Sequence, residues 1–505
     1  MREYANTVCG VDVSKEPLGK LPDMETVDAV LKHLSRLKKS ENEIMTNHGR
    51  TGRDEENTTD RGHSGRDGEE NATNHGGPGR DGDGNATQHS RPDGDGASPT
   101  QPLFLAVGFH KPHIPLKFPR EFSDLYPLDS IQLPDLRSRT KPADLPDVAW
   151  NPWNDIRRRD DVAAAHPAFP FGPLLPDDYQ RRVRQSYFSS ISYVDDLFGK
   201  LMSGIEDRFP EFFSNSIVVF TSDHGWSLGE HGEWSKYSNY EIATRVPLMV
   251  YDSDLHDYQG HANSEMKNES LTRFAYRNPL DLLDERTAGN AEKSFAYRRS
   301  DRVPTEIFRR LDRVPTESYR RSDRVVELVD LFPTLAELVV EEKVPSCPVS
   351  TKARLIPTCA EGDSFASLMA INNLDYNNSD SDSDFDLYSD FSNFSQSSSF
   401  TIKTALSQFP RPGPMPTKVP DSDQPKMSEI RVMGYSIRWL QFRYAEWIGF
   451  DNETLRPDFS EVFGKELYDH SRDANEDDNV SGMFEYSGIE EYLSSLLRQR
   501  TIWQT

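Results

Sequence analysis

A continuous apolar stretch that ends in an acid and a histidine constrains the fold of this chain more than any other feature. The segment SIVVFTSDHGWSLGEHGEWSKYS, 216–238, begins with an apolar run rich in β-branched residues, which is typical of a strand buried on both faces of a parallel sheet. In open α/β sheets, ligand-binding groups gather on the loops beyond the carboxyl ends of the strands. Asp223 and His224 stand at such a position, and Lys236 follows on the same segment. The sequence therefore predicts a site on this loop.

A second apolar run, PLFLAVGF at 102–109, also ends in ionisable residues, in the sequence HKPHIP. Its length predicts another buried strand, and the prolines after it exclude a helix directly afterwards. Apolar residues at helical spacing predict helices within 24–39 and 177–205. Because helices and buried strands alternate, we expect the two strands to be parallel, with His113 and Asp223 at one edge of the sheet.

The C-terminal part has a different pattern. MGYSIRWLQFRYAEWIGF, at 433–450, predicts two strands of alternating character, as in an antiparallel sheet half exposed to water. We therefore expect an α/β domain formed by 1–41 and 99–345, followed by a smaller α+β subdomain at 346–505.

Three inserts interrupt these domains. Residues 42–98 repeat a unit rich in Gly, Asp and Asn with almost no apolar side chains, so they cannot bury enough surface to offset the entropy of ordering. Residues 255–324 carry an Arg-rich repeat of 11 residues that leads into an amphipathic segment. Residues 372–400 are acidic and rich in Ser. We expect the first and the third insert to be disordered and the second to be a solvated loop.

Composition limits the partners of the chain. A net charge of −25 over 505 residues argues against nonspecific binding to nucleic acid, so a polyanionic partner would need a local basic pocket. No segment approaches the length of apolar sequence that a membrane span needs, and the first ten residues contain no apolar run of a signal peptide. We expect no nucleic acid partner and no membrane span.

Cysteines and glycosylation sequons point to an oxidising compartment. Candidate glycosylation sites include Asn268, Asn452 and Asn479. Cys347 and Cys359 flank a short loop that contains proline, and we expect them to form a disulfide. Cys9 would then have no partner among the three cysteines of the chain.

Seven segments in collinear order carry a family resemblance. They are FLAVGFHKPHIP, NPWNDIRRRDDV, QRRVRQSYFSSISYVDD, TSDHGWSLGEHGEWSKYS, VELVDLFPTLAEL, SQFPRP and MGYSIR. Together they resemble the sulfatase family of the alkaline phosphatase superfamily, and within it the branch that acts on iduronate. The resemblance implies a mostly parallel sheet flanked by helices, a lysosomal or secretory location, and hydrolysis of the 2-O-sulfate of terminal iduronate in heparan or dermatan sulfate.

The resemblance also implies roles for residues on the two polar loops. Asp223 and His224 would supply one side of a Ca²⁺ site, although oxygen-seeking Ca²⁺ suits Asp223 better than His224. His113 and Lys236 would contact the sulfate, and either could protonate the departing sugar oxygen. Taken alone, Asp-His after a strand is more often a helix cap beside a hydrogen-bonded loop histidine.

Two aromatic residues flank these polar positions. The resemblance makes Trp226 and Tyr237 candidates for a wall that binds the sugar. A packing role in the core explains both residues equally well, so the sequence leaves the two interpretations open.

The nucleophile of the family is absent from these 505 residues. In sulfatases it is a cysteine, converted to formylglycine, in a Cys-x-Pro-x-Arg sequence, whereas the three cysteines here lie in VCGVD, PSCPVS and PTCAE. The aspartate pair that ends the first strand of the family is absent as well, so we expect that strand to be missing. Two functions stay open: a sulfuric ester hydrolase that is incomplete as written, and an inactive form that binds sulfated glycan.

Overall fold

The computed structural model describes most of the chain outside the predicted inserts. The described residues are 6–51, 102–152, 156, 159–165, 174–253, 322, 324–347, 359–370, 403–416 and 424–502. The predictions for 42–98, 255–324 and 372–400 fall almost entirely outside these residues. Contacts divide the chain into one unit formed by Met1–Leu31 and Gly108–Thr505 and a second formed by Lys32–Val107, and each is considered by itself.

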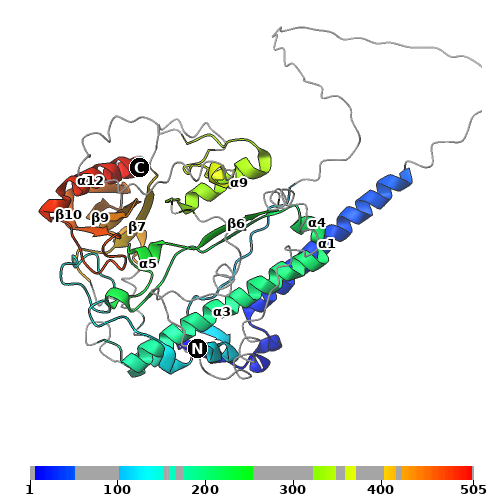
Figure 1. Ribbon diagram of the computed structural model, residues 1–505, viewed down its shortest axis with the longest axis horizontal. Coiled ribbons are helices and arrows are strands. Elements are labelled where there is room, and N and C mark those ends of the chain that lie inside the picture. Colours follow the sequence, from blue (N-terminus) through cyan, green and yellow to red (C-terminus); the bar gives the residue numbers. More distant parts are fainter. Residues whose placement is uncertain are drawn as a thin grey trace, which may run out of the picture. The chain divides into compact units, whose positions relative to one another are not determined.

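Both predicted helices are confirmed, and they are longer than expected (Figure 1). The first is α1, Pro22–Thr51, and the second is α3, Asp177–Arg208. The most buried face of α3 is not a purely apolar stripe, because Ser189 and Ser190 are both fully buried. Each serine hydroxyl donates to the carbonyl four residues earlier in the helix, which satisfies its hydrogen bond inside the core.

The strand predicted from SIVVF is confirmed as β3, Ile217–Thr221, but its expected neighbour is wrong. β3 pairs antiparallel with β6, Leu248–Asp252. The run 102–109 forms no strand, and Leu103 and Phe104 within it are 49% and 80% exposed. An apolar run becomes a strand only where a neighbour accepts its hydrogen bonds, so its composition alone did not decide its structure.

A parallel pair does exist in another part of the chain. It joins β1, Val8–Val11, to β2, Leu116–Pro119. Over the described ranges the sheets are therefore mixed, and the predicted mostly parallel sheet is not observed. Shorter elements complete this part of the chain: α2 Asp160–Ala165, α4 Pro210–Phe213, β4 Ser227–Leu228, β5 Trp234–Ser235, α5 Glu241–Thr244, α9 Leu331–Val340 and α10 Ala366–Ala370.

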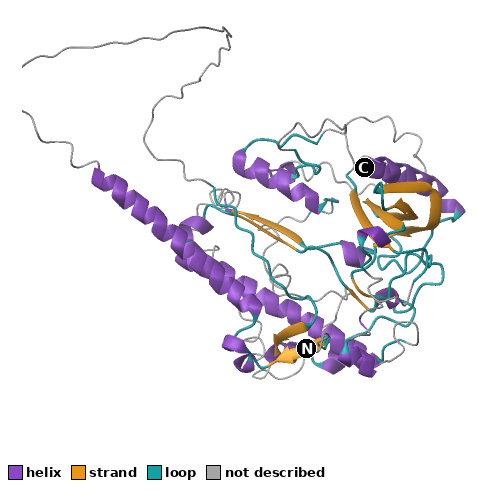
Figure 2. Cartoon of the chain, turned by 180° about the vertical axis from the view of Figure 1, so that it is seen from behind, coloured by secondary structure: helices purple, strands orange, loops and turns teal. Residues whose placement is uncertain are grey.

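The C-terminal region forms a four-stranded antiparallel sheet in the order β10-β9-β8-β7. Its strands are β7 Ala405–Arg411, β8 Val432–Trp439, β9 Phe442–Asp451 and β10 Arg456–Asp469, and the helix α12, Ser487–Ile502, packs against it (Figure 2). The predicted hairpin of two strands is thus confirmed.

The expectation that this hairpin is half exposed is wrong. Ile437, Tyr444 and Trp447 are fully buried. Leu493 and Leu497 of α12 belong to the cluster on one face of the sheet, while the segment 145–149 packs with Trp447 on the other. Because both faces of the sheet are covered, the side chains that alternate between the two faces are buried on both sides. None of the described helices is long and apolar enough to cross a membrane.

Candidate active site

The loop after β3 brings His224 into contact with Lys236. The Nε2 atom of His224 lies 2.6 Å from Lys236 Nζ, and its Nδ1 atom lies 2.8 Å from the carbonyl oxygen of Gly225. A carbonyl can only accept, so Nδ1 carries the proton and Nε2 accepts from the lysine. Asp223 Oδ2 lies 3.2 Å from the same Nε2, and its side chain is 83% exposed. The two residues expected to bind metal thus contact each other, and His224 also contacts Lys236.

The backbone of this loop is fixed by α5. The amides of Gly225 and Trp226 donate to the carbonyl oxygens of Ala243 and Ile242, at 2.8 and 2.9 Å. A Cβ atom at position 225 would clash with the carbonyl oxygen of Ile242, so the close approach requires glycine. The Asp-His-Gly sequence therefore places its two polar side chains by docking its glycine on a short helix.

His113 lies on the second polar loop, within electrostatic range of Lys236. Its ring is solvent-accessible, its Nδ1 atom lies 2.6 Å from the carbonyl oxygen of Ile114, and the ring of His110 lies 4.9 Å away. Partial burial of the ring lowers the pKa of His113, the hydrogen bond with Ile114 opposes this shift, and the charge of Lys236 adds to it. Burial also lowers the pKa of Lys236. His224 and Lys236 thus form one polar cluster, and His113 lies within electrostatic range of it.

Lys111 holds the loop that carries His113, a role that the sequence did not reveal. Its ammonium donates to the carbonyl oxygens of His113 and of Pro115, the latter at 2.8 Å. Lys111 is only 8% exposed, and this burial lowers the pKa of its side chain to about 8. In the sequence, this contact is signalled only by a lysine directly before two closely spaced prolines in HKPHIP.

The two candidate aromatic residues differ in accessibility. Trp226 is 9% exposed and stacks on Tyr187 with ring centres 5.9 Å apart, so its ring is mostly core. Tyr237 is half-buried, and its hydroxyl accepts a hydrogen bond from Gln424 Nε2 at 2.5 Å. The ring of Phe409, from β7, meets its edge at 6.0 Å. Sequence analysis missed both C-terminal contacts because they are remote along the chain.

Comparisons with known proteins agree with the motifs at these positions. The family model described as Sulfatase matches residues 86–274, a span that contains both polar loops. Iduronate 2-sulfatase of Mus musculus is 33% identical over 488 residues, which cover 96% of this chain and 66% of that protein. The Homo sapiens iduronate 2-sulfatase is 32% identical over 478 residues, with 94% and 65% covered. The chain belongs to the sulfatase family.

This sulfatase chain spans about two thirds of the length of those relatives, at 66% and 65%. Among solved structures, a phosphonate monoester hydrolase of Agrobacterium radiobacter is 15% identical and has a TM-score of 0.42. That match covers 80% of this chain and 57% of the other.

The part of the sulfatase chain that the structure describes does not form a Ca²⁺ site. Its residues include no group of three or more His, Cys, Asp or Glu arranged to hold a metal. Ca²⁺ takes six to eight oxygen ligands, whereas Asp223 offers one exposed carboxylate and His224 Nε2 already accepts from Lys236. The described residues therefore do not fit the ion that the family resemblance implied.

The remaining sequence predictions concern covalent modification. The disulfide between Cys347 and Cys359 is present, and Cys9 is a free cysteine. Asn268 lies outside the described residues. Asn479 is buried, and its amide nitrogen donates to the carbonyl oxygens of Lys465 and Asp144 at 3.0 and 3.2 Å.

The two glycosylation candidates in the C-terminal subdomain differ in their contacts. Both amide hydrogens of Asn479 are used inside the fold, so a glycan at this residue would cost at least one of these hydrogen bonds. Asn452 is half-buried on the turn after β9 and donates to the carbonyl oxygen of Ser428. Glycosylation of Asn452 stays a prediction.

Proposed function

We propose that this chain carries part of the active site of a sulfuric ester hydrolase for terminal 2-sulfated iduronate in heparan or dermatan sulfate. The observation that carries the proposal is the cluster of Lys236 and His224, which lies on a sulfatase motif. The substrate is inferred from the similarity to iduronate 2-sulfatases. The disulfide supports a lysosomal or secretory location, where thiols oxidise.

The cluster is suited to bind a sulfate monoester. The ammonium of Lys236 has three hydrogens, and the contact with His224 uses one of them. The other two can be directed at sulfate oxygens, which brings a positive charge to the anionic sulfate group. His113 uses its Nδ1 hydrogen on the carbonyl oxygen of Ile114, so its Nε2 atom can donate to the sulfate only when the ring is protonated. Because burial lowers the pKa of Lys236, this lysine can give up a proton more readily to a departing sugar oxygen.

Turnover needs an attacking group that these 505 residues do not supply. They contain no Cys-x-Pro-x-Arg sequence, and charge stabilisation cannot replace a nucleophile. We therefore expect the chain as written to bind a sulfated iduronide without hydrolysing it. The second candidate function, an inactive form that binds sulfated glycan, makes the same prediction for these 505 residues.

Calorimetric titration of the 505-residue chain with a 2-sulfated iduronide tests the binding function. Lys236→Ala should weaken binding at least about tenfold, as expected for a lost charge-assisted contact. Lys200→Ala is the matched control, because Lys200 pairs with Asp196 on α3. Equal affinity of the wild type and Lys236→Ala would refute the assignment. A parallel fluorogenic assay should show no product, and turnover that His113→Ala abolishes would reveal an unrecognised nucleophile.

A further inference from the structure

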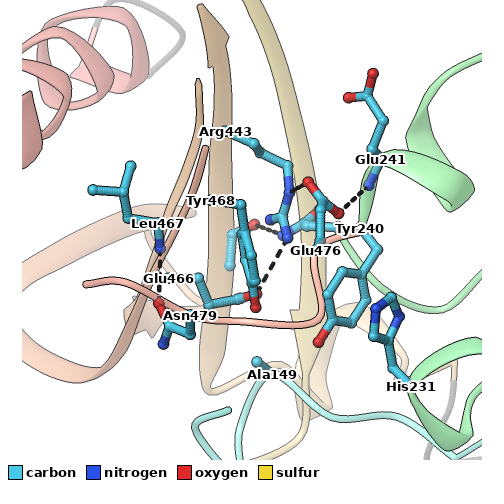
Figure 3. Close-up of polar contacts among 12 residues, drawn as sticks. Ala149, His231, Tyr240, Glu241, Arg443, Glu466, Leu467, Tyr468, Glu476 and Asn479 are labelled. Atoms are coloured by element: carbon cyan, nitrogen blue, oxygen red, sulfur yellow. Dashed lines mark hydrogen bonds and ion pairs between the residues drawn. The ribbon is translucent and has the colours of Figure 1, made fainter. Parts of the chain in front are cut away.

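The candidate active-site loop is connected to the C-terminal subdomain through α5. Gly225 and Trp226, which follow His224 directly, donate their amides to carbonyl oxygens of α5. At the other end of this helix, the amide of Glu241 donates to Glu476 Oε2 at 2.8 Å (Figure 3). We propose that Glu476 is a positioning residue for the active-site loop and acts on it through α5. The inference rests on the proposed function only because that loop carries Asp223 and His224.

Glu476 is itself held rigidly. Its Oε1 atom accepts from Arg443 Nε at 2.6 Å and lies 2.8 Å from His470 Nε2. Arg443 is 1% exposed and lies 3.4 Å from a second carboxylate, that of Glu466. One oxygen of Glu476 thus faces the buried arginine of β9, while the other faces α5. Figure 3 shows the carboxylate between Arg443 and the backbone of Glu241.

The charge and the backbone of Glu476 agree with this role. Burial by itself would raise the pKa of Glu476, but Arg443 and His470 lower it to about 2, so the acceptor is ionised at physiological pH. Its φ angle is +62°, in the left-handed region that glycine and asparagine enter most readily. A glutamate persists there where its surroundings fix it, and here the fixing contacts are those of its carboxylate.

A second buried carboxylate in the same sheet provides the contrast. Glu446 on β9 is fully buried and accepts from Tyr444 Oη at 2.7 Å, Ser494 Oγ at 2.6 Å and Arg498 Nη2 at 3.0 Å. These partners lie on β9 and α12, away from α5. Loss of either carboxylate should destabilise the sheet, but only loss of Glu476 should loosen the active-site loop.

The first test removes the backbone N–H of Glu241 that donates to Glu476, and a matched variant controls for the loss of the Glu241 side chain. Glu241 is the first residue of α5, and the preceding Tyr240 has φ −59° and ψ 146°, a backbone that tolerates a following proline. Glu241→Pro deletes the N–H donor, whereas Glu241→Ala keeps it and removes the same side chain with its ion pair to Arg438. Hydrogen exchange of the Gly225 and Trp226 amides is then compared in the full 505-residue chain.

We expect exchange of these two amides to be about tenfold faster in Glu241→Pro than in Glu241→Ala, since a hydrogen bond to a buried carboxylate is lost. Equal exchange in the two variants would overturn the proposal. The measurement needs no substrate, so its outcome is independent of whether the chain binds a sulfated sugar.

A second pair of variants separates positioning from general stability. Glu476→Gln and Glu446→Gln both neutralise a buried carboxylate paired with arginine. At a denaturant concentration that gives both variants the same global stability, Glu476→Gln should still show the faster exchange at Gly225. If the two variants exchange alike, Glu476 contributes only to the stability of the sheet, and the proposal is wrong.

Discussion

The pair β3–β6 and the hairpin β8–β9 show that the sequence of a strand does not by itself decide its burial. β3 reads IVVFT and is half-buried or exposed along its whole length. β8 reads VMGYSIRW, which contains polar residues, and only Arg438 within it is not buried. The difference lies in what packs on each sheet. β8 and β9 have a helix on one face and the segment 145–149 on the other, whereas β3 has one paired strand within the described ranges.

This difference matters because the candidate active-site loop follows the less buried strand. A half-buried pair of strands contributes less burial free energy to fix a loop. The contacts of Gly225 and Trp226 with α5, and of α5 with Glu476, instead connect the loop to the well-packed C-terminal sheet. The active-site loop and the C-terminal sheet that holds it in place thus come from different parts of the sequence.

The largest expected effect comes from the centre of the C-terminal sheet. Trp447 is fully buried, its Nε1 atom donates to Glu466 at 2.7 Å, and the guanidinium of Arg411 lies 4.8 Å from its ring. Trp447→Ala should lower the free energy of unfolding by about 4 kcal/mol, because it opens a large cavity and removes a buried donor. Denaturant titration measures the loss.

Phe484→Ala is the control for that experiment. Phe484 is 94% exposed, so its substitution should change the free energy of unfolding by less than about 0.5 kcal/mol. Similar losses for the two variants would mean that the sheet is not the stable core that its burial indicates.

A smaller, pH-dependent effect is expected at Glu233, which precedes β5. This side chain is 2% exposed, and its Oε1 atom accepts from the amide of Asn151 at 2.7 Å. Burial raises the pKa of Glu233 from 4.5 to about 8, although Asn151, Arg411 and Ser238 oppose the shift. The folded state therefore binds the proton more tightly than the unfolded state. The resulting stability is present below pH 4.5 and is lost as the pH rises towards 8.

Glu233→Gln should remove this loss, because an amide can still accept from Asn151 and does not ionise. Between pH 5 and pH 8, the wild type should lose about 3 kcal/mol more stability than the variant. Denaturation midpoints at several pH values measure the difference. Glu476→Gln is the control, since the depressed pKa of Glu476 changes stability only as the pH falls below about 4.5. Parallel pH profiles for wild type and Glu233→Gln would contradict the buried, protonated state.

Local patterns in the sequence predicted the elements, but not their neighbours. Helical spacing predicted α3, a β-branched run predicted β3, and alternating polar and apolar residues predicted the β8–β9 hairpin. The run 102–109 carries the same local signal as β3 and forms no strand, because pairing depends on residues elsewhere in the chain. The burial of β8 and β9 was missed for the same reason, since it depends on α12 and on 145–149.

The sequence predicted those site residues that lie in family motifs, and it missed the contacts that join distant segments. Family motifs selected His113, His224 and Lys236, and the structure brings His224 and Lys236 into contact. The contact from Glu241 to Glu476 joins positions 235 residues apart, and no periodicity or spacing reports such a pair. The absence of a metal cluster around Asp223 among the described residues also depends on tertiary geometry that one motif does not contain.

The smallest expected effect is on β3, which belongs to the less buried of the two strand pairs. Phe220 on β3 is half-buried, and its ring meets Phe198 of α3 edge-on at 5.0 Å. Phe220→Ala should therefore cost about 1–2 kcal/mol, below the usual loss for a fully buried aromatic side chain. A double-mutant cycle with Phe198→Ala should give a coupling of about 1 kcal/mol, because the ring pair is the main specific contact. A loss as large as that of Trp447→Ala would show that β3 is packed in solution as tightly as β9. The loop after β3 would then be fixed by its own strand, and its dependence on α5 and Glu476 would have to be correspondingly weaker.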